Sequence, residues 1–408
     1  MTAPKSSIHY GWHIVWSGTL CIFASLGLGR FALGMLLPAM GESLNLSYTQ
    51  MGFISTSNFT GYLLAVLGCS LLTARLGHRL VIFLAMLLIG TTMILIGQSG
   101  LFIPILILYF LTGIGSGAVN VPTMALVSGW FSRKKRGRAT GFAVIGSGFA
   151  ILLAGKLIPI LNERGGAEGW RLGWITLGVI VLAAAVICFL VQRNSPQEMG
   201  LEPCGREEMD TNAPLPEADR KIDRKTVLHL CAIYFLFGAT YVVYVTFFVT
   251  SLVRDRGFSE ISAGNFWAWV GALSLLSGPI FGTMSDRFGR KAALVTVFSI
   301  QATAYLLAGL QQVPELFLYA SIGCFGLTAW AIPSIIAAMA SDLAGPQQAA
   351  RIFGFITFIF SLGQISAPAV AGFLAEQSGN FSSSFMMTAI LAAGGAILAG
   401  LLPASKKV

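Results

Sequence analysis

The sequence predicts an all-α membrane protein with twelve transmembrane helices arranged as two pseudo-symmetric six-helix bundles. Hydrophobic residues make up 55% of the chain and charged residues only 11%, whereas a soluble domain carries about 25% charged residues. Apolar stretches of about 20 residues, the length that crosses a bilayer as a helix, follow one another along the chain. Short motifs of the first half also recur in the second half at a nearly constant spacing. A water-soluble globular protein is therefore excluded.

Polar turns rich in charge, glycine and proline divide the chain into the twelve expected spans. We expect the first six at residues 12–38, 50–73, 79–98, 102–130, 138–161 and 171–192. We expect the second six at residues 227–253, 261–285, 291–310, 314–341, 349–375 and 382–403. Ser47 and Gln50 have the spacing of a helix capping box, which places the start of the second span close to them.

One connection differs from the others in length and composition. Residues 194–226 are polar and contain four prolines, which is typical of a linker rather than of a membrane span. We therefore expect an N-terminal six-helix bundle at residues 1–193, a cytoplasmic linker at 194–226 and a C-terminal six-helix bundle at 227–408.

Lysine and arginine residues are distributed unevenly between alternate turns, and the turns on one side of the membrane carry most of them. These residues are Arg75, Arg79, Arg133, Lys134, Lys135, Arg136, Arg138, Arg193, Arg220, Lys221, Arg224, Lys225, Arg287, Arg290, Lys291, Arg351, Lys406 and Lys407. The opposite turns carry mainly Arg164, Arg254 and Arg256. Cytoplasmic loops are enriched in Lys and Arg, so we expect both termini and the linker in the cytoplasm and the chain in a bacterial inner membrane. The net charge of +9 is then a topology signal and not a nucleic-acid-binding surface.

The two halves repeat each other at a spacing of 212 residues. Ser47 corresponds to Ser259 at the start of the second span of each half, and Arg75 corresponds to Arg287 in the turn that follows. Parallel repeats joined by a linker are an architecture of secondary transporters, in which the substrate binds between the halves near mid-membrane. We therefore expect Arg75 and Arg287 on the same membrane face.

Arg30 is the first candidate for a binding residue, because it lies alone inside the first apolar span. A charge inside a bilayer costs several kcal/mol on insertion scales and is usually retained for a function. An arginine can bind a carboxylate through two hydrogen bonds and keeps its proton when buried. Two roles remain open: an anion ligand that faces the helix bundle, or a side chain that snorkels to the outer interface. The neighbouring Gly27 and Gly29 indicate close helix packing and favour the first role.

Other polar or amphipathic residues lie deep in spans that are expected to line a central cavity. The candidates for substrate contact are Asn120, Tyr241, Tyr244, Trp330 and Gln364. Each of these has helix packing as an alternative role, and for Lys156 snorkelling is the preferred one. The histidines and cysteines form no motif for a metal, and no P-loop pattern for ATP occurs. We therefore expect no cofactor.

The turn after the eighth span carries a family resemblance. Gly282-Thr-Met-Ser-Asp286-Arg287-Phe-Gly289-Arg290-Lys291 is similar to the G-x-x-x-D-R-x-G-R-K/R signature of the major facilitator superfamily. The resemblance implies the twelve-helix fold of that superfamily and alternating access. It also implies a gating latch formed by Gly282, Asp286, Arg287, Gly289 and Arg290, in which Gly282 permits close helix packing. The copy in the first half is degraded.

Further motifs resemble the monocarboxylate transporters and oxalate–formate antiporters. They are His9-Tyr10-Gly11-Trp12, Asn120-Val-Pro122-Thr123, Gly169-Trp170-Arg171 and the linker opening at residues 193–203. The run at residues 27–40 also resembles a barely characterised bacterial branch of the superfamily. Aligned on Trp12, Arg30 replaces a lysine that takes part in substrate and proton binding in monocarboxylate transporters. Gly278 replaces a second basic residue of that family, and no Asp or Glu lies well inside a predicted span, so proton coupling through a side chain is doubtful.

These observations predict a secondary active transporter and not an enzyme. The expected substrate is a small organic anion, a lactate-like monocarboxylate, carried across the bilayer with or without a proton. The alternative within transport is an exporter of drugs or hydrophobic solutes, for which the aromatic cavity residues argue. An export motif would place a proline at Gly146-Ser-Gly148, where none occurs. A membrane sensor or a membrane-embedded enzyme is the remote alternative, because neither an output domain nor a set of catalytic groups appears.

Overall fold

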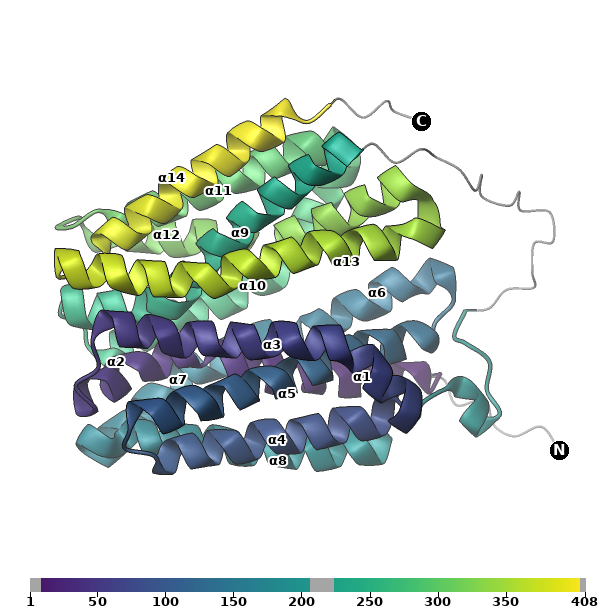
Figure 1. Cartoon of the computed structure of the whole chain (residues 1–408), viewed down its shortest axis with the longest axis horizontal. Coiled ribbons are helices and arrows are strands. Elements are labelled where there is room, and N and C mark those ends of the chain that lie inside the picture. Colours follow the sequence, from purple (N-terminus) through teal and green to yellow (C-terminus); the bar gives the residue numbers. More distant parts are fainter. Residues whose placement is uncertain (1–8, 206–223, 404–408) are drawn as a thin grey trace.

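The structure, a computed structural model, describes residues 9–205 and 224–403. In these ranges the regular structure consists of α-helices with short 3-10 and π segments and one isolated bridge pair, Phe131 with Cys204. The helices lie side by side along the long axis, and the first and last described residues lie at the same end (Figure 1). We call this end, marked by Tyr10 and Leu402, the terminal end. The opposite end, marked by Ser47, is the far end.

The N-terminal half contains six crossings. Three helical segments in direct succession form the first: α1 (Gly11–Ile22), the π-helix η1 (Phe23–Phe31) and α2 (Leu33–Ser43). The others are α3 (Tyr48–Leu76), α4 (His78–Gln98), α5 (Phe102–Gly129), α6 (Arg133–Val144) with α7 (Gly146–Gly165), and, after the 3-10 turn η2 (Gly166–Glu168), α8 (Gly169–Val191).

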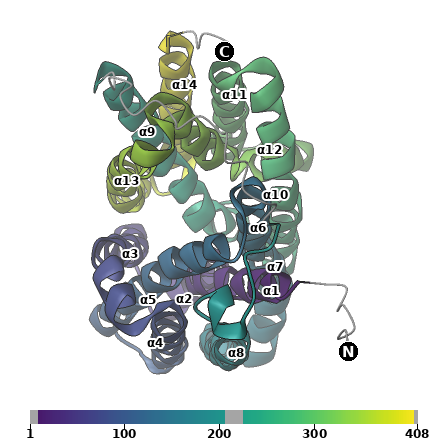
Figure 2. The same ribbon diagram turned by 90° about the vertical axis from the view of Figure 1, so that its right-hand side faces the viewer.

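The C-terminal half follows the 3-10 turn η3 (Pro196–Met199) and residues outside the described ranges. Its elements are α9 (Arg224–Thr250) with the π segment η4 (Ser251–Asp255), α10 (Glu260–Phe288), α11 (Arg290–Gly309), α12 (Glu315–Thr328), α13 (Ala331–Ser378) and α14 (Ser382–Leu401). Figure 2 shows the two halves facing each other, with α3 beside α13 and α7 beside α10.

The predicted number of crossings is confirmed, with local differences. Eleven helical stretches of the described chain are long and apolar enough to span a membrane, and one of them, Lys135–Val191, has 57 residues and accommodates two crossings.

The tenth span is broken between α12 and α13, a break that our expected spans did not include. Pro333 has no N–H to bond the carbonyl of Ala329. In addition, the N–H of Trp330 donates to the Ser277 hydroxyl of α10, at 3.1 Å. Helix α13 also contains the eleventh span.

The predicted repeat is visible in the local geometry of the two halves. Helices α3 and α10 both have 29 residues. Ser47 and Ser259 cap them, each accepting a hydrogen bond from the backbone N–H three residues on. Gly77 and Gly289 follow their last residues with φ of 77° and 90°, in the left-handed region that only glycine adopts at little cost.

Both of these turns lie at the terminal end, as the repeat predicts for Arg75 and Arg287. In the N-terminal half, the backbone N–H of Arg79 bonds Asn194 Oδ1 at 2.9 Å, just after α8. In the C-terminal half, Lys291 Nζ bonds the carbonyl of Leu402 at 2.8 Å.

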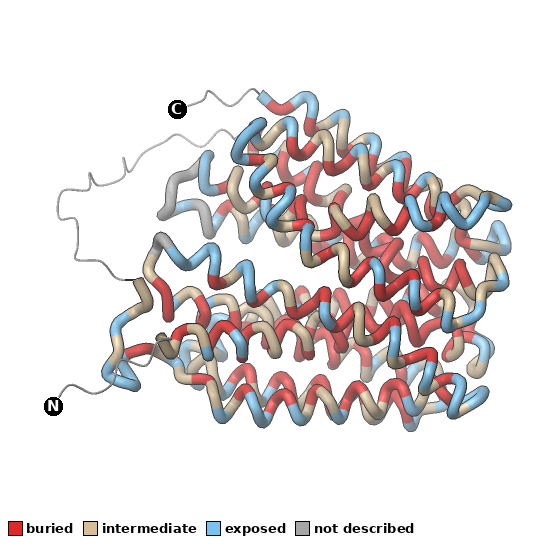
Figure 3. Tube along the Cα trace, turned by 180° about the vertical axis from the view of Figure 1, so that it is seen from behind, coloured by how far each residue is buried: buried red, intermediate tan, exposed pale blue. Residues whose placement is uncertain are grey.

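The halves are in tight contact toward the far end and apart at the terminal end. A Cβ atom on Gly52 or Gly155 would lie 2.3 or 2.5 Å from a backbone oxygen of the other half, whereas one on Gly68, Gly278 or Gly354 would meet nothing within 4 Å. Figure 3 shows the same asymmetry, with buried residues concentrated where the halves meet away from the termini. The structure is therefore closed between the halves at the far end only.

The described start of the predicted linker is bound to the N-terminal half. Cys204 exchanges two backbone hydrogen bonds with the residues just after α5, to Trp130 at 2.9 Å and from Ser132 at 3.1 Å. The remainder, residues 206–223, lies outside the described residues. The division into two bundles at 193 and 227 stays our proposal.

Candidate functional site

Arg30 lies in the π-helical segment of the first crossing. The N–H of Ala32 bonds the carbonyl of Gly27 at 3.1 Å, which is the five-residue step of a π-helix. This widened turn leaves carbonyls for other partners, and α5 supplies two: Ser116 Oγ bonds the Ser25 carbonyl at 2.9 Å and Tyr109 OH bonds the Arg30 carbonyl at 3.0 Å. Short π-helical segments are frequent at functional sites.

The Arg30 side chain points into the protein. Only 7% of the residue is exposed, its Nε donates to Asn58 Oδ1 at 3.3 Å, and its guanidinium lies over the rings of Phe59 and Tyr62, at 4.5 and 4.1 Å from their centroids. Asn58 lies ten residues after the first residue of α3, roughly 15 Å from the far end at 1.5 Å per residue. The snorkelling alternative requires a side chain that reaches toward the far end, and the Arg30 side chain does not do so.

The Arg30 charge has no counter-ion among the residues that the structure describes. Its Nη2 is buried and has no hydrogen-bond partner. The cavity beside it measures about 10 Å³ and is lined by both halves, including Gly34 and Thr246. This volume holds about one water molecule. A buried cation with a free N–H and no carboxylate partner is suited to receive an anion.

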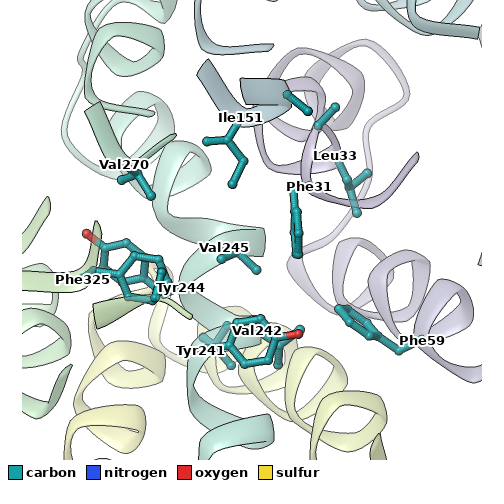
Figure 4. Close-up of a cluster of buried hydrophobic side chains, with 14 of the residues drawn as sticks. Phe31, Leu33, Phe59, Ile151, Tyr241, Val242, Tyr244, Val245, Val270 and Phe325 are labelled. Atoms are coloured by element: carbon teal, nitrogen blue, oxygen red, sulfur yellow. The ribbon is translucent and has the colours of Figure 1, made fainter. Parts of the chain in front are cut away.

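Three of the predicted residues of the C-terminal half form a connected group on the other side of the interface from Arg30. Gln364 Nε2 donates to the Tyr241 hydroxyl, on which the Arg30 charge also acts. The Trp330 ring lies 6.3 Å from that of Tyr241 and 5.3 Å from that of Phe31. In Figure 4 the Tyr241 hydroxyl points toward Phe59 of the N-terminal half.

Asn120 joins the same cluster through a residue that the sequence analysis missed. Its Nδ2 donates to the Tyr62 hydroxyl at 2.7 Å, and the Tyr62 ring lies under Arg30. Asn58 and Tyr62 were both missed, although they are polar residues spaced by four within an apolar span. This spacing places both on one face of a helix and could have identified them. We call Arg30, Asn58, Tyr62, Asn120, Tyr241, Trp330 and Gln364 the central cluster.

Tyr244 lies apart from the central cluster. Its hydroxyl shares a hydrogen bond with Ser321 at 3.0 Å, and its ring stacks on Phe325 at 4.1 Å. Figure 4 shows it on the side of Phe325, away from Tyr241. Its contacts are those of a packing residue in the C-terminal half.

The predicted latch forms contacts within the C-terminal half. Arg290 Nη1 pairs with Asp286 Oδ1 at 2.5 Å and its Nε with Asp342 Oδ2 at 3.2 Å, so that it joins the turn after α10 to α13. Gly289 supplies the positive φ of this turn. The close packing expected at Gly282 is absent, because a Cβ there would meet nothing within 4 Å, and Arg287 is exposed. Both lie at the end where the halves are apart.

The closed far end is held by hydrogen bonds between the halves. Carboxylates of the C-terminal half accept from donors of the N-terminal half in three places. These bonds are Tyr48 OH to Asp255 at 3.4 Å, the Thr49 N–H to Glu376 at 3.3 Å and Asn162 Nδ2 to Glu260 at 2.6 Å. Lys156, for which snorkelling was preferred, donates to Asn265 of α10 at 2.6 Å. We call these four bonds the far-end gate.

The described residues contain no group of three side chains that could hold a metal ion. Their cysteines are all free thiols.

Comparison with known proteins agrees with the architecture. Residues 22–404 match the model of a family described as "Uncharacterised MFS-type transporter YbfB". The chain is 27% identical to the hexuronate transporter of Bacillus subtilis, over 92% of this chain and 89% of that one. It is 22% identical to monocarboxylate transporter 12 of Mus musculus, over 73% and 66% respectively. The fold matches a bacterial homologue of the lysosomal transporter Spinster in an inward-facing, unoccupied conformation, with a TM-score of 0.78, 18% identity and coverage of 97% and 98%. The chain belongs to this YbfB-type family and is a multi-pass membrane transporter of the major facilitator superfamily.

Proposed function

We propose that this transporter carries small organic monoanions, monocarboxylates among them, and that Arg30 is the anion ligand. The observation that supports this most directly is the buried guanidinium whose Nη2 has no partner and which no described carboxylate neutralises. Relatives named for hexuronate and for monocarboxylates transport substrates of this charge. A neutral hydrophobic solute, the rival substrate class, would leave this charge buried without a partner, which is costly.

The proposed mechanism is alternating access between the two halves. The far-end gate is closed and the halves are apart at the terminal end, so an anion would reach the central cluster from the terminal end. We infer that the terminal end, including both termini and the linker, faces the cytoplasm of a bacterial inner membrane, because lysine and arginine gather there. In this orientation the structure is the inward-facing state, and the latch around Arg290 would change its contacts when the terminal end closes.

Any proton that moves with the anion would be carried by the substrate. Arginine keeps its proton under all physiological conditions. Among the described residues, the carboxylates that accept hydrogen bonds across the interface are Asp255, Glu260 and Glu376 of the far-end gate. A weak acid can cross with its own proton without a titrating side chain. A strong-acid anion should therefore move without stoichiometric protons, and a measured one-to-one proton uptake with such an anion would contradict this part of the proposal.

Substitution of Arg30 tests the function. Losing a desolvated charge partner typically costs a few kcal/mol, or roughly 100-fold in affinity. Arg30→Gln should therefore abolish carboxylate uptake into proteoliposomes and thermal stabilisation by carboxylates, while Arg30→Lys should retain part of both. Arg79→Gln is the matched control, because Arg79 also lies over an aromatic ring, Phe189 at 4.2 Å, but at the terminal end. If Arg30→Gln transports the same anions as wild type, Arg30 is a structural residue and the proposed substrate class loses its support.

A further inference from the structure

We propose that the transported monoanion is an aromatic carboxylate, whose carboxylate binds Arg30 while its flat ring lies against the aromatic side chains of the central cluster. This inference rests on the proposed function, since it takes Arg30 as the anion ligand. It adds the chemistry of the remainder of the substrate, which the buried charge alone does not define.

A set of nearly parallel rings leads to the central cluster. Tyr234, Phe237 and Tyr241 of α9 and Phe360 of α13 form it, and we call them the aromatic stack. Tyr234 and Phe360 have centroids 4.3 Å apart with planes 16° from parallel, and Phe237 and Tyr241 are 4.9 Å apart at 17°. Tyr241 and Phe360 are inclined by only 6°. Phe360 keeps part of its surface exposed, so a ligand ring can extend the stack in the offset arrangement that aromatic pairs prefer.

The amide and phenol side chains of the central cluster already have hydrogen-bond partners. Asn120 donates to Tyr62, Gln364 donates to Tyr241, and Asn58 accepts from Arg30 and donates to the Tyr109 carbonyl. A polyhydroxylated acid would bring several hydroxyl groups into this site and would have to break these bonds or leave its own groups unsatisfied, both of which cost free energy. An aromatic ring has no such requirement.

The buried groups of the central cluster that lack a partner are both donors. They are Arg30 Nη2 and Trp330 Nε1. A ligand that completes the cluster must therefore offer acceptor atoms, as a carboxylate does, and needs no donor of its own. Arg30 is also the one charged side chain of the central cluster and is buried, so the site favours one negative charge over two.

Binding of four matched carboxylates to the purified full-length protein tests the inference. Benzoate, cyclohexanecarboxylate, glucuronate and lactate all carry one negative charge, but only benzoate is flat and aromatic. Isothermal titration and thermal shift should both rank benzoate first. Its Kd should be up to roughly 10-fold lower than that of the others, which is the upper range for an aromatic contact. Neutral benzamide should bind at least about 100-fold more weakly than benzoate, because it lacks the charge.

The possible results separate this inference from the function on which it rests. If glucuronate, lactate or cyclohexanecarboxylate binds as tightly as benzoate, the aromatic assignment is wrong and the anion transporter stands. If no carboxylate binds, or if benzamide binds as well as benzoate, the anion assignment itself is overturned.

A pair of variants locates the ring. Phe360→Leu should weaken benzoate roughly 3- to 10-fold and leave lactate unchanged, because only the ring contact is removed. Phe373→Leu is the control, since Phe373 is on the same helix but 52% exposed on the outer surface. Unchanged benzoate affinity in a folded Phe360→Leu protein would overturn the proposed ring position, and so would an equal loss of affinity in the Phe373→Leu control. If Phe360→Leu does not fold, the ligand series on the wild-type protein decides the inference.

Discussion

Arg30 and Asn58 hold each other in place across the first two crossings of the N-terminal half. Arg30 Nε donates to Asn58 Oδ1 at 3.3 Å, Asn58 Nδ2 donates to the Tyr109 carbonyl at 3.2 Å, and Tyr109 OH donates to the Arg30 carbonyl at 3.0 Å. The side chain and the backbone of Arg30 are thus fixed by one closed set of hydrogen bonds. Because every partner is neutral, the guanidinium is oriented without being neutralised.

This arrangement predicts that Asn58→Asp inactivates the transporter. The new carboxylate would lie about 3 Å from the guanidinium and form a buried ion pair with it. The site would then be filled by its own anion, and carboxylate uptake into proteoliposomes should fall roughly 100-fold. Folding should be retained, as judged by a single symmetric peak in size-exclusion chromatography.

Asn58→Ala is the matched control for that substitution. It removes the orienting hydrogen bond but adds no charge, so we expect a smaller loss of uptake, roughly 5- to 10-fold, corresponding to about 1–1.5 kcal/mol for one net hydrogen bond. Equal losses in the two variants would show that orientation, and not charge compensation, governs the site.

Tyr241 and Tyr244 provide a second pair on one helix. Tyr241→Phe removes the hydroxyl that accepts from Gln364 beside Arg30 and should raise the KM for carboxylate uptake several-fold. Tyr244→Phe removes a hydroxyl that bonds Ser321 and should lower the unfolding temperature by a few degrees, about 1 kcal/mol, with KM unchanged. A KM effect in Tyr244→Phe that matches or exceeds the effect in Tyr241→Phe would argue against our assignment of the central cluster.

Single residues show how far the sequence could predict this site. Arg30 could be identified because a charge inside an apolar span is costly in any fold. Asn120, Tyr241, Trp330 and Gln364 were candidates by depth in their spans. The structure brings Asn120 to the cluster around Arg30 from the same half, through Tyr62, and Tyr241, Trp330 and Gln364 from the opposite half.

The remainder depended on helix rotation and on contacts between the halves. Tyr244 could not be separated from Tyr241 by sequence, because both occupy similar depths in one apolar helix. The π-helical turn around Arg30 was equally hidden, since it depends on hydroxyl groups that α5 presents to the freed carbonyls. The break at Trp330 depends on Ser277, a residue from another helix.

The latch provides a prediction about stability. Arg290 pairs with Asp286 and Asp342, but both carboxylate side chains are more than half exposed, at 69% and 57%. Exposed ion pairs contribute at most about 1 kcal/mol, so Arg290→Ala should lower the unfolding temperature only slightly.

Transport is the more sensitive readout for the same substitution. If the latch changes its contacts during alternating access, Arg290→Ala should alter the maximal rate of uptake more than its KM. Arg287→Ala is the control, because the structure shows Arg287 exposed. A larger rate change for Arg287→Ala would indicate that Arg287 makes the important contact in the state that is closed at the terminal end.

The closed far end predicts that bulk at Gly155 shifts the transporter between its two states. A Cβ on Gly155 would lie 2.5 Å from the carbonyl oxygen of Gly264 in α10, so Gly155→Val forces α7 and α10 apart where the halves now meet. Overpacking of this kind costs about 1–3 kcal/mol, which lowers the population of the far-end-closed state by roughly 5- to 150-fold relative to the open one.

Gly394→Val in α14 is the control, because a Cβ there meets nothing within 4 Å. A single cysteine at Ser55, which is buried and bonds Thr246 across the interface at 3.1 Å, should react with a membrane-impermeant thiol reagent from the far side much faster in Gly155→Val than in wild type or in Gly394→Val. Equal labelling rates in all three proteins would show that the contact between Gly155 and Gly264 does not control closure of the far end.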